Sequence, residues 1–212
     1  MDINTFEKMP LLGILRDIAE DMIKPVADIS VSAGLNSIEI TMNTKHATRL
    51  IRQMTDYASS ELMVGAGTVL SMDSLNSALD AGASYIVMPC HIPEIVEYCV
   101  LQGIPVFPGA ITPNEVFTAW HAGATMIKLF PVRFYGPQYV SELKGPYDSI
   151  KFMACGGMTP ENVPLYFEAG ASAVAFGGEI YEQELLKNKE YKSISSNLKK
   201  MVSSYKKWKE GN

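Results

Sequence analysis

The sequence predicts a single-domain α/β protein with the (β/α)8 architecture of a TIM barrel. Two repeating features predict this fold. Short apolar runs bounded by turn residues recur at intervals of roughly 20–25 residues, which is typical of a repeated strand–helix unit. Between these runs, apolar residues follow the spacing of helices that bury one face, as Val96, Val100 and Leu101 do. About eight such units fill the chain, and eight units close a barrel.

The strands are expected where the short apolar runs lie. Runs of this length with turn residues on both sides are typical of buried parallel strands. In chain order they are Leu12–Leu15, Ser37–Met42, Met63–Gly65, Tyr85–Met88, Val106–Pro108, Met126–Phe130, Lys151–Ala154 and Ala173–Phe176.

The helices between the strands carry recurrent start and stop signals. The segment TPNE at 112–115 has the pattern of a capping box with proline at the first helical position. The segment TPE at 159–161 repeats the cap and the proline, and IPE at 92–94 is a weaker copy. Several predicted helices end in Ala-Gly, where glycine supplies the left-handed conformation that stops a helix. These glycines are Gly34, Gly82, Gly123 and Gly170.

An open, doubly wound sheet is the alternative architecture. It would usually show a GxGxxG loop after its first strand, whereas here the first strand runs into Arg16 and Asp17. With 212 residues the chain is close to the minimum length for eight units, so little remains for a lid or a second domain. We expect the barrel to span residues 1–186. Residues 187–212 should form a basic amphipathic helix that packs on it through a stripe of apolar residues.

The composition excludes several classes of protein. Hydrophobic residues make up 47% of the chain, which is too many for a disordered protein. The net charge of −5 is uneven: residues 187–212 hold eight Lys and two Glu, so the first 186 carry −11 and should not attract nucleic acid. No apolar run approaches the ~18 residues of a membrane span. The first ten residues also lack the pattern of a signal peptide.

The cysteines and histidines indicate neither a disulfide framework nor a metal site. The three cysteines form no CxxC pair and leave one unpaired, which is typical of a protein in the reducing cytoplasm. The three histidines lie far apart and form no HxxxH pair. We therefore expect a cytoplasmic protein without a metal.

Glu39 is the first candidate catalytic residue. Barrel active sites lie at the carboxyl ends of strands, so polar residues there are informative. In the second strand Ser37, Glu39 and Thr41 share one face with Asn43, and the other face is apolar. The apolar face should meet the helices, so Glu39 should point into the barrel. A carboxylate there is costly to desolvate without a charged partner, although an ion pair that only fixes packing would leave the same pattern.

Lys128 is the second candidate, because it is the one lysine in the apolar segment MIKLF at 126–130. It shares a strand face with Met126 and Phe130. Burial disfavours the ammonium form of a lysine, so such an amine is a usable nucleophile and can form a Schiff base with a carbonyl substrate. The alternatives are a lysine that pairs with Glu39 only for packing, or one whose charged end extends to solvent at the rim of the barrel. Because the first 186 residues hold only ten Lys and Arg, we favour the nucleophile.

Glycine pairs follow the last two predicted strands. They are Gly156-Gly157 and Gly177-Gly178. In barrels the loops after these strands often bind phosphate through backbone N–H groups, and glycine lets an anion approach closely. A single pair is also common in a tight turn, but two pairs at these two strand ends favour phosphate.

Two further strand ends carry weaker signals. Thr68 follows the small residues of Gly65–Gly67 and offers a hydroxyl above the barrel, although a threonine there is often only a cap. Pro89 follows the fourth strand and is similarly ambiguous.

Taken together, these segments resemble one known family. They are IEITMNT around Glu39, GAGTVL at 65–70, the segment around Pro89, FPGAITPNE at 107–115, IKLFP at 127–131 and GGMTPEN at 156–162. They are similar to the class I 2-keto-3-deoxy-6-phosphogluconate (KDPG) aldolases. That family includes the 4-hydroxy-2-oxoglutarate (KHG) aldolases and the 2-keto-3-deoxy-6-phosphogalactonate (KDPGal) aldolases. The resemblance covers about residues 5–186, in order and with similar spacing.

The resemblance implies a (β/α)8 barrel, usually a homotrimer, with no metal or other cofactor. It implies that Lys128 forms the Schiff base, that Glu39 shuttles protons and that Thr68 helps to hold the pyruvyl carboxylate. Further residues would line the pocket or hold the phosphate. They are Arg16, Pro89 and Phe130 for the pocket, and Gly156, Gly157, Gly177 and Gly178 for the phosphate.

The reaction implied is cleavage of KDPG to pyruvate and glyceraldehyde 3-phosphate, so the partner is a small 2-keto acid. KDPGal or KHG is an alternative substrate for the same mechanism. A phosphosugar isomerase or epimerase with Glu39 as its base, and a barrel that binds sugar acids without turnover, are the rival classes, since a fold does not fix a function.

Several positions depart from the family pattern. In KDPG aldolases an arginine that helps to bind the carboxylate often stands where Asn43 does; asparagine is similar to the KDPGal branch, as is GPQY at 136–139. Cys155 stands where threonine is common, and Gly178 where serine is common, so two hydroxyl donors to phosphate are missing. Arg133 offers a replacement charge, although the sequence does not fix the direction of its side chain.

Overall fold

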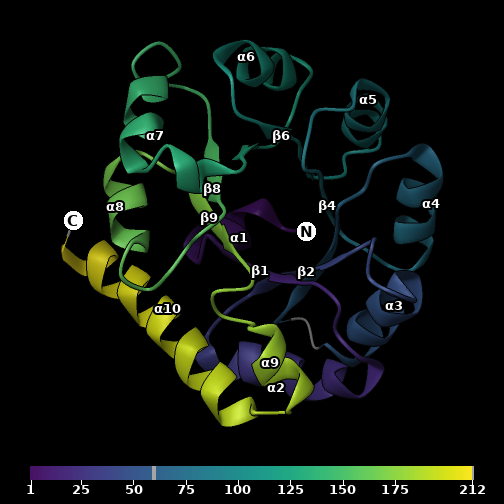
Figure 1. Cartoon of the computed structure of the whole chain (residues 1–212). Helices are drawn as coiled ribbons and strands as arrows, with labels where there is room; N and C mark the ends of the chain where they lie inside the picture. The colour runs from purple at the N-terminus through teal and green to yellow at the C-terminus, as the bar shows by residue number, and fades with distance from the viewer. Residues whose placement is uncertain (59–60, 212) are drawn as a thin grey trace.

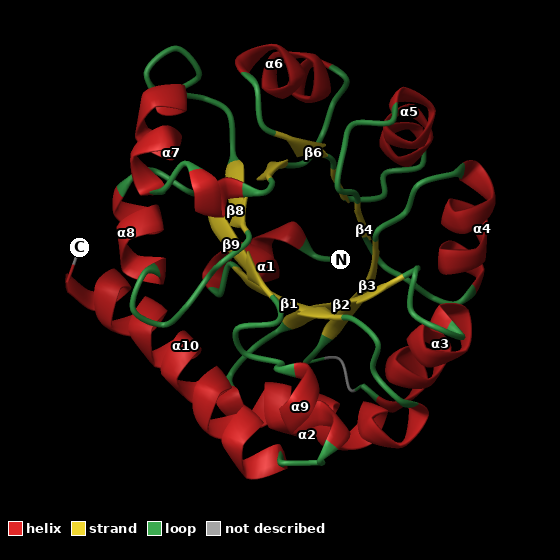
Figure 2. Ribbon diagram, in the orientation of Figure 1, coloured by secondary structure: helices red, strands yellow, loops and turns green. Residues whose placement is uncertain are grey.

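A computed structural model describes residues 1–58 and 61–211 as a barrel of parallel strands surrounded by helices (Figures 1 and 2). The strands form one sheet in the order β5-β4-β3-β2-β1-β9-β8-β7-β6. They are β1 (Leu11–Leu15), β2 (Ser37–Thr41), β3 (Met63–Gly67), β4 (Ile86–Val87), β5 (Val106–Phe107), β6 (Gly109–Ala110), β7 (Ile127–Leu129), β8 (Phe152–Cys155) and β9 (Ala173–Phe176).

The two edge strands of this sheet, β5 and β6, are halves of one stretch interrupted at Pro108. Phe107 pairs with Val87 of β4, and Gly109 pairs with Lys128 of β7. The Lys128 N–H donates to the Pro108 carbonyl at 2.9 Å, so pairing continues past the interruption. The stretch therefore joins the ends of the sheet and closes the barrel. This confirms the predicted (β/α)8 fold, in which the eight expected strands are all found.

Helices surround the barrel. They are α2 (Ile23–Ala33), α3 (Ala47–Tyr57), α4 (Met72–Asp80), α5 (Pro93–Leu101), α6 (Pro113–His121), α7 (Pro137–Lys144), α8 (Val163–Glu168), α9 (Gln183–Lys187) and α10 (Tyr191–Gly211), with 3-10 turns η1 (Glu20–Met22) and η2 (Val132–Phe134). The predicted capping box is present at Thr112 and Glu115. The four Ala-Gly glycines all have the positive φ that ends a helix.

The helix after β8 begins later than the sequence indicated. It starts at Val163 rather than directly after Thr159. The reason is the side chain of Asn162, whose Oδ1 accepts from the Thr159 N–H at 2.9 Å and whose Nδ2 donates to the Gly157 carbonyl at 2.8 Å. These bonds hold residues 157–162 in a turn, so helical geometry begins only beyond it.

A short N-terminal helix, α1 (Ile3–Lys8), was not predicted. Asp2 caps it, and its Phe6 is fully buried against Phe107 inside the barrel, with ring centroids 6.1 Å apart. Figure 2 shows α1 across the opening of the strand ring. The helix thus covers the end of the barrel opposite the carboxyl ends of the strands.

Alternate residues of the strands build two separate cores. The outward face packs under the helices, and the inward face fills the barrel. The fully or almost fully buried residues inside are Leu12, Tyr85, Val87, Phe107, Met126, Met153, Cys155, Ala173 and Ala175, together with Phe6. This alternation gives each inward-facing polar side chain dry surroundings.

The C-terminal helix α10 lies along α2 and α8 (Figure 1). It buries Ile194, Leu198, Met201 and Tyr205 of the apolar stripe, while its lysines face outward. In the described part of the chain, no helix is long and apolar enough to cross a membrane.

Candidate active site

Among residues 1–58 and 61–211, two charged side chains are buried inside the barrel, Glu39 on β2 and Lys128 on β7. Glu39 is 1% exposed and Lys128 is 6% exposed. Glu39 points inward between Ser37 and Thr41, as the alternation of β2 requires. A Cβ on the neighbouring Gly67 would lie 2.3 Å from the Glu39 Oε1 atom, so glycine at this position makes the room that the carboxyl group occupies.

Burial dominates the electrostatics of Glu39. It raises the pKa of the Glu39 carboxyl, while the charges of Lys128 and Arg16 pull the pKa the other way. Among the described residues, the Glu39 Oε2 atom is buried and has no hydrogen-bond partner. A carboxyl group with a raised pKa and an uncommitted oxygen is suited to exchanging protons with a bound substrate.

Lys128 is the central residue of β7, and its amine lies beside Phe130, which follows β7, and Cys155, the last residue of β8. Its Nζ atom is 5.3 Å from the ring centroid of Phe130, on the shared strand face that the sequence predicted. Cys155 of β8 is close by: burial raises the pKa of its thiol, and Lys128 acts in the opposite direction. The Lys128 amine is therefore flanked by the Phe130 ring and the Cys155 thiol.

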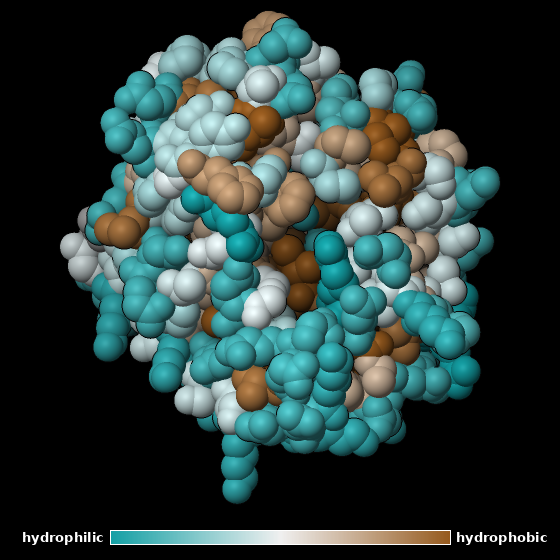
Figure 3. Space-filling model, in the orientation of Figure 1, coloured by the Kyte–Doolittle hydropathy of each residue, from teal (hydrophilic) through white to brown (hydrophobic). Residues whose placement is uncertain are grey.

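A cavity of about 390 Å³ opens at the barrel mouth, and its lining includes Phe130 and Cys155, the two residues beside the Lys128 amine. Figure 3 looks onto this end and shows hydrophobic atoms in a central hollow framed by hydrophilic ones. The cavity brings together several of the predicted site residues. They are Arg16, Phe130, Gly156, Gly177 and Gly178.

A second cavity, of about 280 Å³, adjoins the first. Pro89 lines it together with Cys90 and His91, and Phe130 lines both cavities. Five of the predicted site residues line neither cavity: Glu39 and Lys128, which are buried inside the barrel, and Asn43, Thr68 and Gly157. Asn43 is exposed beyond the end of β2.

Thr68 has an unusual backbone conformation. Its φ of +56° lies in the left-handed region, which a β-branched residue rarely adopts. It directly follows β3, whose Gly67 carbonyl accepts from the Met42 N–H at 2.7 Å. Strain of this kind is concentrated at functional sites, which is consistent with a role for the Thr68 hydroxyl or backbone.

The two glycine loops differ in geometry. After β8, Gly156 and Gly157 both have positive φ, +105° and +75°, so only glycine fits without strain. After β9, the Gly177 carbonyl accepts from the N–H groups of Ile180 and Tyr181, which makes a tight turn. A Cβ on Gly178 would meet nothing within 4 Å, so this position is open toward the cavity.

The structure shows where Arg133 points, which the sequence left open. Its Nη2 atom is 2.9 Å from Oε1 of Glu179, and both residues line the first cavity. Glu179 was missed by sequence reasoning because an exposed loop has no periodic pattern to place its side chains. Tyr85 was also missed: it is fully buried in the barrel, and its hydroxyl has no hydrogen-bond partner among the residues that the structure describes. The sequence did offer a signal: Tyr85 and Val87 are two positions apart on one strand, so both should face the barrel interior.

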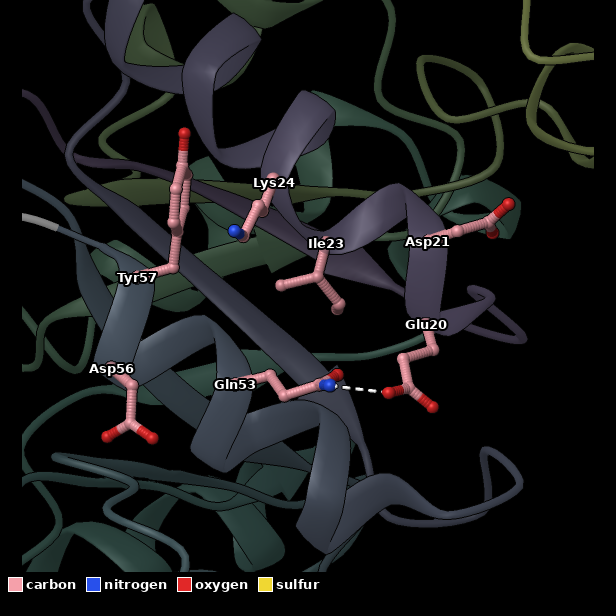
Figure 4. A pocket seen from close by; sticks show the side chains of 7 residues that line it. All are labelled: Glu20, Asp21, Ile23, Lys24, Gln53, Asp56 and Tyr57. Carbon is pink, nitrogen blue, oxygen red and sulfur yellow. Dashed lines mark hydrogen bonds between the residues drawn. The ribbon is translucent and has the colours of Figure 1, made fainter.

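A larger cleft of about 640 Å³ lies outside the barrel, between α2 and α3 (Figure 4). Two of the carboxylates that line it, Glu20 and Asp21, already have partners. Glu20 accepts from Gln53 and Arg49, both at 2.6 Å, and Asp21 pairs with a lysine of the segment before α10. None of the residues that line this cleft is a buried lysine next to a carboxyl group, as Lys128 is inside the barrel. We therefore place the candidate active site at the barrel mouth.

The comparison with known proteins decides the family. The sequence model of the family described as KDPG and KHG aldolase matches residues 3–197. The chain belongs to this aldolase family. Its members are lyases, and their names denote small-molecule substrates.

Two curated relatives are named for different substrates. The 2-dehydro-3-deoxy-6-phosphogalactonate aldolase of Escherichia coli K12 is 35% identical over 82% of this chain and 85% of its own length. The 2-dehydro-3-deoxy-phosphogluconate aldolase of Pseudomonas aeruginosa is 32% identical over 80% of this chain and 76% of its own. A solved structure described as native KDPGal superimposes with a TM-score of 0.90 at 30% identity, covering 96% of this chain and 97% of the other.

Proposed function

We propose that this aldolase works through a Schiff base on Lys128 and cleaves a 2-keto-3-deoxy-6-phospho sugar acid to pyruvate and glyceraldehyde 3-phosphate. The observation that carries the proposal is the placement of Lys128 and Glu39, a buried amine and a buried carboxyl group whose charges interact inside the barrel. The amine lies beside Phe130 and Cys155, which line the mouth cavity. KDPG and KDPGal yield the same two products, because they differ only in the stereochemistry at C4.

The chemistry follows from these two groups. The Lys128 amine attacks the C2 ketone, and the carbinolamine that forms takes up a proton and loses water, which gives an iminium ion; the final hydrolysis releases that proton again. The iminium accepts the electrons of the C3–C4 bond as the C4 hydroxyl loses its proton to Glu39, and the aldehyde departs. Glu39 then returns a proton to C3 of the enamine, and hydrolysis of the iminium frees pyruvate and Lys128.

The remaining predicted residues would hold the two ends of the substrate. Thr68 and Asn43 would hold the pyruvyl carboxylate, with Arg16 contributing charge near Glu39. Pro89 and Phe130 would line the middle of the pocket. The phosphate would bind at the rim, to the backbone of Gly156, Gly177 and Gly178, which line the cavity, and of Gly157 next to them.

Within this class KDPGal is the substrate that the observations favour over KDPG. Asn43 and GPQY at 136–139 are similar to the KDPGal branch, and the native KDPGal fold superimposes closely. KHG is the third candidate. A lactate-dehydrogenase-coupled assay of pyruvate release from all three acids ranks them, and equal rates on KDPG and KDPGal would contradict discrimination at C4.

Trapping with pyruvate and borohydride tests the mechanism. Reduction of the iminium should add one pyruvyl-derived mass, and peptide mapping should place it on Lys128. A Lys128→Met variant should give no adduct, whereas Lys144→Met on α7 is the control. An adduct on another residue, or activity abolished by EDTA, would exclude the proposal; an epimerase or a binding barrel would give no pyruvate from the sugar acid.

We further propose a cytoplasmic homotrimer. Large apolar side chains are exposed on consecutive outer segments of the barrel, and such surface is a common site of subunit contact. They are Val100 and Leu101 on α5, Phe117 on α6 and Phe134 on η2. Light scattering of the purified chain would measure the mass, and a monomer at micromolar concentration would contradict the trimer.

A further inference from the structure

Arg133 lies directly against the first glycine pair. The turn η2, in which it stands, is anchored by Val132, which is fully buried. The Arg133 Cβ atom is 3.0 Å from the position that a Cβ would take on Gly157, and its Nε atom is 3.8 Å from the same position on Gly156. Glycine at both positions therefore leaves space for the arginine side chain at the rim of the cavity.

The same arginine reaches the second glycine pair. Its Nη2 atom donates to Oε1 of Glu179 at 2.9 Å, and Glu179 directly follows Gly177 and Gly178. The guanidinium thus spans the two loops that follow β8 and β9. No element of the barrel requires this bridge, since each loop is already closed by its own hydrogen bonds to Asn162 or to the Gly177 carbonyl.

The ion pair is one that an anion can displace. Its side chains are 51% and 26% exposed, and pairs at that exposure contribute only about 0–1 kcal/mol to stability. The guanidinium has five N–H donors, and most of them remain available beside the one given to Glu179. A phosphate group accepts two parallel, charge-assisted hydrogen bonds from arginine, which are stronger than this pair.

The loops also need a cation if they are to hold a phosphate. Cys155 and Gly178 stand where hydroxyl donors would otherwise serve, so the backbone N–H groups act without side-chain help. In addition, the Glu179 carboxylate next to the glycines would repel a phosphate if it were unpaired. A single arginine between the loops supplies donors to the anion, and its positive charge still offsets that of the nearby Glu179 after the phosphate has displaced the carboxylate from direct contact.

We propose that Arg133 binds the terminal phosphate of the substrate, and that Glu179 holds the guanidinium over the glycine pairs until the phosphate takes its place. This inference rests on the proposed aldolase function, since it names the side chain that recognises the end of the substrate remote from Lys128. It makes Arg133 a specificity-determining residue that selects phosphorylated sugar acids over shorter, unphosphorylated 2-keto acids.

The two partners should respond to substitution in opposite directions. Arg133→Gln should raise KM for the 6-phospho sugar acid by roughly 10- to 100-fold, through loss of charge-assisted hydrogen bonds, with kcat nearly unchanged. Glu179→Gln should lower that KM, because the competitor for the guanidinium is gone. The KM of Arg133→Lys should lie between those of the wild type and Arg133→Gln, because lysine keeps the positive charge but cannot donate two parallel hydrogen bonds as a guanidinium does.

Several results would overturn the inference. One is an unchanged KM in Arg133→Gln, and another is an equal rise of KM for KHG, which has no phosphate. A third is a rise of KM in Glu179→Gln as large as in Arg133→Gln, because the pair would then only fix the loops. The matched control is Arg49→Gln, which removes a comparable exposed ion pair with Glu20 on the outer surface and should leave KM unchanged.

Two measurements separate this inference from the proposed mechanism. Borohydride trapping with pyruvate, which has no phosphate, should be equally efficient in wild type and in Arg133→Gln. Calorimetry with inorganic phosphate needs no turnover, and Arg133→Gln should weaken that binding by roughly 10-fold or more. Failure of trapping in the wild type would reject the mechanism alone, while equal phosphate binding in both proteins would reject the role of Arg133.

Discussion

At the floor of the cavity, Glu39 and Lys128 stand on strands and are almost completely buried. At its rim, Arg133 in the turn η2 and Glu179 in the loop after β9 have side chains that are 51% and 26% exposed. The floor groups are held by the packing of the barrel, and their charges are costly because they are dry. The rim groups pair with each other and keep access to water, so their interaction is weak and exchangeable. The two ends of the cavity therefore suit different tasks. The covalent chemistry at Lys128 and Glu39 needs side chains that are fixed and shielded from water, whereas binding of a phosphate at Arg133 needs a charged side chain that can exchange its partner.

The largest test of this contrast is Glu39→Gln at the floor. Turnover should fall by roughly 10²–10⁴-fold, because the amide cannot take up or return the proton, while the borohydride-trapped adduct on Lys128 should persist. Steady-state kinetics and mass spectrometry measure the two effects. Glu20→Gln, which changes a carboxylate of the outer cleft, is the control. Full turnover in Glu39→Gln would refute the proton-shuttle role.

A smaller effect, on stability, is expected when one glycine at the floor and one at the rim of the cavity are each replaced by alanine. A Cβ on Gly65 would lie 2.3 Å from the ring of the fully buried Tyr85, so Gly65→Ala should destabilise the fold by about 1–3 kcal/mol. Gly178→Ala at the rim meets no atom within 4 Å and should change stability by less than about 0.5 kcal/mol. Urea denaturation compares the two variants, and equal losses would show that the rim is as closely packed as the floor.

The buried Glu39 at the floor of the cavity should also make the stability of the protein depend on pH. The pKa of Glu39 is raised in the folded protein, so above the ordinary glutamate pKa the folded state binds more protons than the unfolded state. The free energy of unfolding should therefore decrease as pH rises through the raised pKa. Glu39→Gln lacks this term and should be the more stable protein at neutral pH. Thermal unfolding of both proteins from about pH 5 to about pH 8 measures the difference; parallel curves would contradict the raised pKa.

The smallest effect is expected from Tyr85→Phe. The buried Tyr85 hydroxyl has no hydrogen-bond partner among the described residues, so its removal should leave stability unchanged or increase it by up to about 1 kcal/mol. The matched variant is Tyr139→Phe, whose hydroxyl donates to the Ile111 carbonyl and whose loss should cost about 1 kcal/mol. If both variants lose stability equally, the Tyr85 hydroxyl must be satisfied in solution.

The floor was accessible to sequence reasoning because its signals are local. Alternation along β2 is enough to turn Glu39 to the face opposite Ile38 and Ile40, and the structure has it there. The same rule places Lys128 with Phe130. The short helix α1 was missed because six residues give too little periodicity, and the later start of α8 depends on one side chain, Asn162, that ties a turn.

The sequence by itself determined the repeated strand–helix unit, the barrel and the two charged residues that face its interior, because hydrophobic periodicity is a property of neighbouring residues. Only the tertiary structure decided that Arg133 and Glu179, 46 positions apart, meet across two glycine loops at the rim. Their contact depends on how three consecutive strand ends are placed around a closed barrel. That placement is set by the packing of the whole sheet, and no local pattern in the chain encodes it.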